Sequence, residues 1–326
     1  MNMKIVKRIG VFFLVLLVLL AGSSMWINKL LRSNGDQIKG RSKPIASMTA
    51  EPAESLDIVV VGDSESYNTV STMELWEQYG ITTFDCGQTG QRIQEAYYAL
   101  KTAFRTQSPK LVIVETNMLF RDKGTIKNVQ MSLAEPLRYY FPVFRYHNIW
   151  KTLFDDPTEE RTDYKGFRIR EQTKAYTGKD YLDKAKKVEE ISPFAEIYME
   201  KIQKLCDKNG AQILFISAPS PVNYNGKRLT AVQNYAKELN IPYIDFNSKL
   251  DEIGLDWSKD SLDKGDHLNI FGAKKATEYL GKYLAENYTF EDHRGDTKYS
   301  EWDDLSKEYD AEFKARTEKV KGASKK

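Results

Sequence analysis

A serine that directly follows a buried apolar run is the first residue of this sequence that could carry chemistry. Residues 56–68 read LDIVVVGDSESYN, and Ser64 stands two positions after Gly62 ends the run. The β-branched residues of this run predict a short buried strand that brings Ser64 to its carboxyl end. In an open α/β sheet ligands bind at this edge, although Gly, Asp and Ser also form ordinary turns.

A serine hydroxyl attacks at neutral pH only when a neighbouring base removes its proton, and histidine is the usual base. The sequence holds only three histidines. His293 lies in a polar tail, and His147 lies among aromatic residues, where a structural role is expected. His267 follows the last predicted strand, at the same sheet edge as Ser64. We therefore expect Ser64 and His267 to meet.

A carboxylate must orient that histidine, and acyl transfer also needs amide donors for the oxyanion. Asp263 and Asp266 are the local carboxylates. Asp263 is preferred because a residue adjacent to His267 has poor geometry for reaching its ring, and a pair without any aspartate stays open. The donors that follow predicted strands and could converge are the Ser64 N–H, the Gly90 N–H and the Asn117 side chain.

The elements that would position these residues alternate between strands and helices. Strands are expected at 58–61, 81–84, 111–114, 212–217 and 241–246, with helices at 73–79, 91–105, 193–208, 229–239 and 272–284. This order predicts an α/β fold, a three-layer α/β/α sandwich with a mainly parallel sheet. The folded domain is expected over residues 55–289.

An uncharged apolar segment at residues 9–27 precedes this domain. About 20 such residues span a bilayer as a helix, so residues 1–28 are predicted to form an N-terminal membrane anchor. A cleaved signal peptide is the alternative, with small residues at 21–23. Basic residues before the span favour a cytoplasmic N-terminus and an extracellular domain. Polar residues 29–54 are expected to form a linker.

Two further segments depart from the alternating pattern. Residues 121–190 are an insertion with an aromatic cluster, expected to form either a lid over the site or a flap over exposed core. Residues 290–326 are a charged tail, predicted to be helical because apolar residues recur at spacings of three and four. Packing of this tail on its own domain is favoured over a partner site.

Composition excludes several classes of function. The chain has 326 residues and a net charge of +2, so no broad basic field suggests nucleic acid. Its two cysteines, Cys86 and Cys206, have no metal-type spacing and are expected to be free and buried, although a disulfide stays open. Neither a dinucleotide fingerprint nor a phosphate loop occurs. No metal or organic cofactor is expected.

The chain resembles the SGNH (GDSL-type) hydrolase superfamily, whose four blocks supply Ser, Gly, Asn and His in this order. The resemblance covers roughly residues 56–284 and implies an SGNH/flavodoxin-like fold. The matching residues are Gly62-Asp63-Ser64, Thr89-Gly90, Glu115-Thr116-Asn117 and Asp266-His267-Leu268-Asn269. It implies Ser64 as nucleophile, His267 as base, and Gly90 and Asn117 as oxyanion donors.

Three positions depart from the family pattern. Glu65 replaces the usual leucine, and Glu115 stands where the family usually has glycine. The family's orienting aspartate lies three residues before the histidine, and Lys264 occupies that position here. Asp263 or Asp266 would have to replace it.

A membrane anchor followed by an outward SGNH domain is similar to cell-envelope proteins that esterify or de-esterify glycans. The resemblance thus implies a serine esterase or O-acyltransferase acting on a polysaccharide or small ester, with a membrane-bound O-acyltransferase as an expected partner. A non-catalytic glycan-binding or scaffold protein is the alternative. A lipase or thioesterase is a third.

Overall fold

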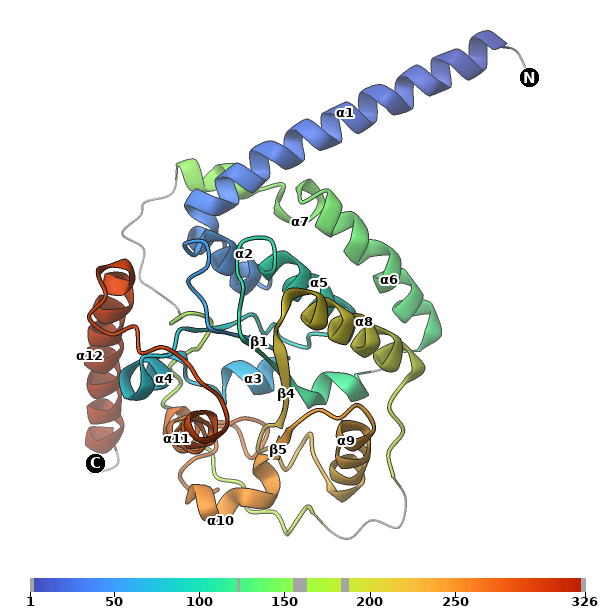
Figure 1. Cartoon of the computed structure of the whole chain (residues 1–326). Coiled ribbons are helices and arrows are strands. Elements are labelled where there is room, and N and C mark those ends of the chain that lie inside the picture. The colour runs from blue at the N-terminus through green and yellow to red at the C-terminus, as the bar shows by residue number, and fades with distance from the viewer. Residues whose placement is uncertain (1–2, 122–123, 155–162, 183–187, 324–326) are drawn as a thin grey trace. The chain divides into compact units, whose positions relative to one another are not determined.

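The computed structural model describes residues 3–121, 124–154, 163–182 and 188–323, so parts of the predicted insertion and the end of the tail lie outside the described residues. The chain forms two compact units, and each is described by itself (Figure 1). Unit 1 comprises Met1–Glu51 and Gly124–Glu159, and unit 2 comprises Pro52–Lys123 and Glu160–Lys326. The predicted insertion is thus divided between them.

Unit 2 contains, in its described part, a five-stranded parallel sheet with the order β2-β1-β3-β4-β5. The strands are β1 (Ile58–Val61), β2 (Thr83–Asp85), β3 (Leu111–Glu115), β4 (Gln212–Ser217) and β5 (Tyr243–Asp245). Each overlaps its predicted position. This is the strand order of the flavodoxin-like doubly wound sheet, so the α/β prediction is confirmed.

Helices cover both faces of this sheet. The helices of unit 2 are α3 (Ser64–Tyr67), α4 (Thr72–Tyr79), α5 (Ile93–Ala103), α8 (Pro193–Asn209), α9 (Gly226–Glu238), α10 (Leu250–Ile253), α11 (Ile270–Asn287) and α12 (Ser300–Ala323). Short 3-10 helices are η2 (Thr116–Phe120), η4 (Phe246–Lys249) and η5 (Thr297–Tyr299).

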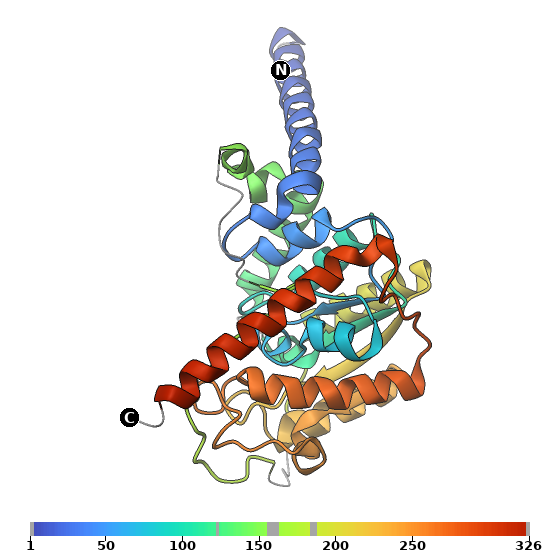
Figure 2. The same cartoon turned by 90° about the vertical axis from the view of Figure 1, so that its left-hand side faces the viewer.

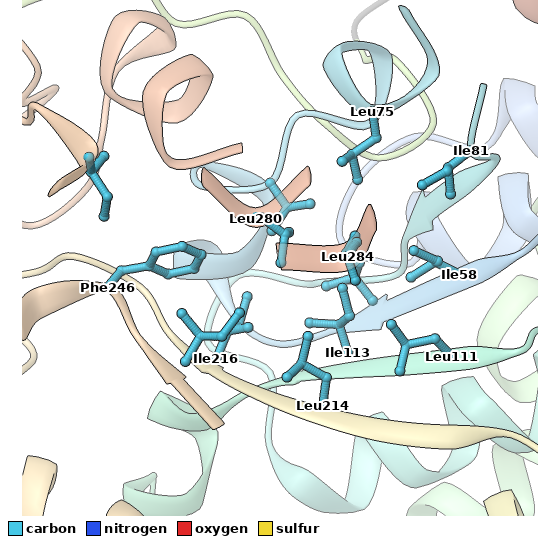
Figure 3. Packing of buried hydrophobic residues seen from close by; sticks show 14 residues of the cluster. Ile58, Leu75, Ile81, Leu111, Ile113, Leu214, Ile216, Phe246, Leu280 and Leu284 are labelled. Carbon is cyan, nitrogen blue, oxygen red and sulfur yellow. The ribbon is translucent and has the colours of Figure 1, made fainter. Parts of the chain in front are cut away.

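Alternate residues of the strands face opposite helical layers, because successive strand side chains point to opposite faces. Figure 3 shows Ile58, Ile113 and Leu214 packing toward Leu280 and Leu284 of α11. On the other face, Phe215 of β4 stacks on Tyr235 of α9, with ring centroids 6.4 Å apart. The runs of fully buried strand residues are those typical of a parallel sheet covered on both faces.

The strand register places the turn after β1, which carries Ser64, beside the turn after β3, which carries Asn117. β1 pairs in parallel with β3, from Ile58 opposite Leu111 to Val61 opposite Val114. The carboxyl ends of these strands therefore lie at the same edge, and the residues that follow them are neighbours in space. Between β1 and β3 the chain order reverses, which is where ligands bind in such sheets.

The charged C-terminal tail is part of unit 2, as the sequence favours. Its helix α12 lies beside α4 (Figure 2), against which it packs with buried apolar side chains. Trp302 lies 5.4 Å from Trp76 between ring centroids, and Tyr309 lies 5.2 Å from Tyr164. Trp302, Tyr309 and Leu305 are all buried.

Unit 1 is helical in its described part. Its elements are α1 (Met3–Asn34), η1 (Gly35–Gln37), α2 (Lys43–Ala50), α6 (Thr125–Tyr140), α7 (Val143–Tyr146) and η3 (Ile149–Leu153). The most apolar 18-residue window of the first helix has a mean hydropathy of 2.4, and none of it is buried. By length and composition this helix could cross a membrane.

The structure differs from the predicted linker over residues 29–54. Helix α1 continues to Asn34, and α2 buries most of its residues. These residues are ordered by packing between segments that are far apart in the sequence. A core cluster joins the end of α1 to the insertion, and its members include Ile27, Leu30, Leu31, Tyr146 and Ile149. Local periodicity does not reveal an apolar partner that lies so far along the sequence.

Cys86 and Cys206 are free thiols, and both are buried. Burial raises the pKa of the Cys206 thiol to about 12. The expectation of two buried cysteines that form no disulfide is confirmed, and the disulfide alternative is wrong.

The docking of α12 predicts a stability effect. Replacing Trp302 with alanine removes a buried aromatic side chain, and such changes lower the free energy of unfolding by about 3–5 kcal/mol. Denaturant unfolding of the full-length protein in detergent measures the loss. Lys307→Ala, on the exposed face of the same helix, is the control. Equal stability of the two variants would mean that the tail does not contribute to the fold.

Candidate active site

Ser64 is the first residue of α3, at the carboxyl end of β1. The chain can turn there because Gly62 has no side chain: a Cβ atom at this position would lie 2.6 Å from Cβ of Glu115. Asp63 then caps the short helix, since its Oδ1 accepts a hydrogen bond from the Glu65 N–H at 2.9 Å. The turn is thus fixed on both sides of Ser64.

Ser64, His267 and Asp263 form a connected chain of hydrogen bonds. The His267 Nε2 atom lies 2.8 Å from Ser64 Oγ, and its Nδ1 atom lies 2.8 Å from Asp263 Oδ2. Asp263 also accepts the His267 backbone N–H at 2.7 Å. Asp266 is more distant, with its Oδ2 atom 3.7 Å from Nδ1. The carboxylate that orients the ring is therefore Asp263.

A backbone reversal explains how a residue four positions earlier reaches the histidine. Lys264 has a φ of 67° and Gly265 a φ of 88°, so both adopt the left-handed region. The Gly265 N–H donates to Ser261 Oγ at 2.7 Å, which holds the reversal in place. A left-handed lysine costs roughly 1 kcal/mol. Strain of this kind is common where a site needs a particular geometry.

Asn117 lies in η2, directly after β3, and its donors and acceptor are largely engaged. Its backbone N–H donates to the Glu115 carboxylate at 3.0 Å, and its Nδ2 donates to Asp63 Oδ2 at 2.9 Å. Its Oδ1 accepts from Arg228 Nη1 at 2.9 Å. Glu115, which departs from the family pattern, thus positions Asn117. One Nδ2 hydrogen remains for a further acceptor.

Gly90 lies in the turn after β2, half-buried, with a φ of 61°. The preceding Thr89 is hydrogen-bonded through its side chain to the Tyr67 hydroxyl of α3 at 2.9 Å, which ties this turn to the helix that begins at Ser64. Within the described chain, neither the Ser64 N–H nor the Gly90 N–H has a hydrogen-bond acceptor. Both donors are available for an oxyanion.

Buried carboxyl groups surround this framework. Asp63 is completely buried and pairs with Arg121. Burial, followed by the charges of Asp63 and Glu115, raises the pKa of Glu65 well above its usual range. Burial also raises the pKa of Glu115, with Asp63 adding to the effect. Burial is thus the main cause of the raised pKa of both Glu65 and Glu115.

Glu65, Asp266 and His267 offer donor atoms within 4.8 Å of one another, a grouping that could hold a cation. Both His267 ring nitrogens already face Ser64 and Asp263. The Asn223 amide donates to Glu65 Oε1 at 2.6 Å and to Asp266 Oδ1 at 2.5 Å. Hydrogen bonds from Asn223 account for this cluster, so we assign no metal to it.

A polar cavity of about 370 Å³ lies beside Asp263. Its lining combines the cationic side chains of Arg170, Lys174 and Arg316 with the carboxyl groups of Glu171 and Asp263. Arg316 is paired with Glu171 at 3.2 Å, whereas Arg170 has no ionic partner among the described residues. The space next to Asp263 therefore suits a polar, hydrogen-bonding ligand.

Sequence reasoning did not identify three residues that hold this site together: Arg121, Asn223 and Arg228. Arg121 lies four residues after Asn117, a proximity that could have drawn attention to it. Arg228 lies in α9, and its guanidinium also stacks over the Phe120 ring at 4.7 Å. No local signal in the sequence connects it to Asn117.

Comparisons with known proteins place few limits on this site. No protein-family model matches the chain, and no curated protein does. A Bacteroides fragilis structure described as "a putative acylhydrolase" is 12% identical, with a TM-score of 0.39, over 75% of this chain and 94% of its own. A Streptococcus pneumonia structure described as "a putative platelet activating factor" is 13% identical, with a TM-score of 0.39, over 87% and 100%.

Because both TM-scores are low, the fold assignment rests on the strand order, and the description of the site rests on its own hydrogen bonds.

Asp85 gives a prediction for the pH dependence of stability. Burial raises its pKa from 3.8 to about 7, so between these values the folded state keeps a proton that the unfolded state loses. Stability therefore falls as pH rises through this window, at up to about 1.4 kcal/mol per pH unit. Asp85→Asn does not titrate, so its stability relative to wild type should increase between about pH 4 and 7 and level off above.

Denaturant unfolding at several pH values measures this difference. The exposed substitution Asp304→Asn is the control and should leave the pH profile unchanged. A wild-type advantage that grows with pH would contradict the raised pKa of Asp85.

Proposed function

We propose that this protein is a serine esterase or O-acyltransferase that forms a covalent acyl intermediate on Ser64. The observation that supports this most is the continuous hydrogen-bonded series from Ser64 Oγ through His267 to Asp263. Three donors that could serve an oxyanion lie on the turns around it: the Ser64 N–H, the Gly90 N–H and Asn117 Nδ2.

The first half-reaction follows from this arrangement. Ser64 Oγ attacks the carbonyl carbon of an ester, and the Ser64 hydroxyl proton passes to His267 Nε2. The π electrons of the C=O bond move to the carbonyl oxygen, which becomes an oxyanion. The three donors stabilise that oxyanion. When the tetrahedral intermediate collapses, the bond to the leaving alcohol breaks and His267 returns the proton to it. Asp263 stabilises the imidazolium in between.

The second half-reaction uses the same groups in reverse. His267 takes a proton from water or from a sugar hydroxyl, whose oxygen attacks the acyl group on Ser64. Collapse of the new intermediate breaks the Oγ–carbon bond, and the proton returns to Ser64. Water yields hydrolysis, and a sugar hydroxyl yields O-acyl transfer. In both half-reactions His267 accepts the proton and later returns it.

The substrate class we propose is the O-acyl group, such as O-acetyl, of a cell-envelope polysaccharide. Support comes from the resemblance to cell-envelope proteins that modify glycans. The polar cavity beside Asp263 is compatible with such a ligand, but its lining includes neither Ser64 nor His267. A lipase or thioesterase therefore stays an alternative. A helix that can cross a membrane supports a single-pass protein with its catalytic domain outside. A membrane-bound O-acyltransferase is the proposed acyl source.

A non-catalytic glycan-binding scaffold remains the second candidate. Its main support in the sequence is that Lys264 occupies the position of the family's orienting aspartate. The hydrogen bond from His267 to Asp263 weakens this support, because Asp263 can orient the ring instead.

Labelling with a fluorophosphonate tests the nucleophile. The full-length protein in detergent should react, because His267 activates Ser64 Oγ, whereas Ser64→Ala should not label. Hydrolysis of p-nitrophenyl acetate should fall at least about 10⁴-fold in Ser64→Ala and in His267→Ala. Ser66→Ala, two residues further along, is the control and should keep its label. Equal labelling of wild type and Ser64→Ala would favour the scaffold.

The two aspartates near His267 give a second test. In Asp263→Asn the amide stabilises the wrong imidazole tautomer, and kcat should fall by about 10²–10⁴-fold. In Asp266→Asn, kcat should change by less than about tenfold, because this carboxylate lies beyond hydrogen-bonding distance of the ring. Steady-state hydrolysis of p-nitrophenyl acetate measures both. Larger damage from Asp266→Asn would reverse the assignment.

A further inference from the structure

Helix α6 of unit 1 presents its apolar side to the outside. Its two fully buried positions are polar, Asn128 and Glu135. Its exposed positions include a stripe at spacings of three and four, between 44% and 76% exposed: Ile126, Val129, Leu133, Leu137 and Tyr140. A helix on the surface of a soluble protein has the reverse pattern. Within unit 1 this apolar stripe therefore has no apolar partner among the described residues.

The same kind of surface continues beyond α6. Large apolar side chains are also exposed in the segment that contains α7 and η3: Phe144, Trp150, Leu153 and Phe154. Large apolar side chains exposed together on one segment are unusual for a soluble monomer and point to an interaction site. We call these four residues, together with the five of the α6 stripe, the interfacial surface.

The position of the interfacial surface along α1 identifies its environment. The segment that contains α7 and η3 packs on Ile27, Leu30 and Leu31 through Tyr146 and Ile149. These α1 residues lie at the end of the apolar stretch 9–27 or directly after it. In a membrane spanned by that stretch, residues packed on Ile27–Leu31 lie at the level of the lipid headgroups. Tryptophan and tyrosine are enriched at that level.

The charges of this segment fit a membrane as well. Within residues 124–154 the basic side chains are Lys127, Arg138, Arg145 and Lys151, and the acidic one is Glu135. Glu135 is buried and paired with Arg138 and Arg145. The exposed charges are therefore basic, which favours anionic lipid headgroups. Apolar side chains combined with basic ones are typical of helices that lie in the membrane interface.

We propose that unit 1 contacts the membrane twice: α1 crosses it, and the interfacial surface lies in the headgroup region of an anionic bilayer. The occupant of the apolar stripe of α6 is lipid. This proposal depends on the insertion of α1 but not on the chemistry of Ser64.

Site-specific fluorescence in vesicles tests the contact. The full-length protein carries Leu133→Cys or Leu137→Cys, labelled with an environment-sensitive nitrobenzoxadiazole dye; the native cysteines are buried. In vesicles of phosphatidylcholine and phosphatidylglycerol, brominated lipids should quench these labels at least about twofold more than a label at Lys204→Cys, an exposed position in unit 2. The quenching should weaken in pure phosphatidylcholine.

Two outcomes would overturn the proposal. Labels at positions 133 and 137 that are quenched no more than the control would mean that lipid does not cover α6. Labels shielded from water but not quenched by brominated lipid, with shielding that depends on protein concentration, would mean contact with a second copy. Hydrolysis of p-nitrophenyl acetate by the same samples monitors the proposed function separately, so failure of one does not imply failure of the other.

Discussion

The buried carboxylate of Asp63 is the group that joins the separate turns of the site. It accepts hydrogen bonds from the Glu65 N–H and from Asn117 Nδ2, and it pairs with Arg121. Its partners come from the helix after β1 and from the segment after β3. A fully buried carboxylate is tolerated only when it is paired and hydrogen-bonded. The position of Ser64 relative to Asn117 therefore depends on Asp63 being satisfied.

Several features of the candidate site have a cost in stability. Glu65 and Glu115 are buried beside it with raised pKa values, and Lys264 holds a left-handed backbone. None of these features would be selected for folding alone. Glu115 holds the Asn117 backbone, and Lys264 allows Asp263 to reach His267. Functional sites commonly retain destabilising features of this kind.

Unit 1 has a different distribution of polar and apolar side chains, which a nonpolar environment outside the protein would explain. Glu135 is buried among arginines while Leu133 and Leu137 are exposed. In water this pattern would oppose the hydrophobic effect. At a bilayer interface, exposed leucines and a buried, paired glutamate are the expected distribution. Under the membrane proposal, unit 1 would contact the bilayer, while unit 2 carries the candidate chemistry.

The sequence by itself determined most of unit 2. Apolar runs ended by glycine or proline specify strands and turns locally, and an alternating order of strands and helices leads to a parallel sheet. Because all carboxyl ends of such a sheet lie at one edge, the order of strands and turns alone assigns Ser64, Gly90, Asn117 and His267 to one region. The apolar stripe of α12 likewise predicts its docking.

Only the tertiary structure decided the contacts that depend on backbone direction or on distant partners. The choice between Asp263 and Asp266 depends on the reversal at Lys264 and Gly265, which no local pattern specifies. The link from Arg228 to Asn117 joins residues 111 positions apart. The periodicity of α6 indicates an amphipathic helix but not which side is buried. That orientation depends on the surroundings, because a helix has the same sequence in water and against lipid.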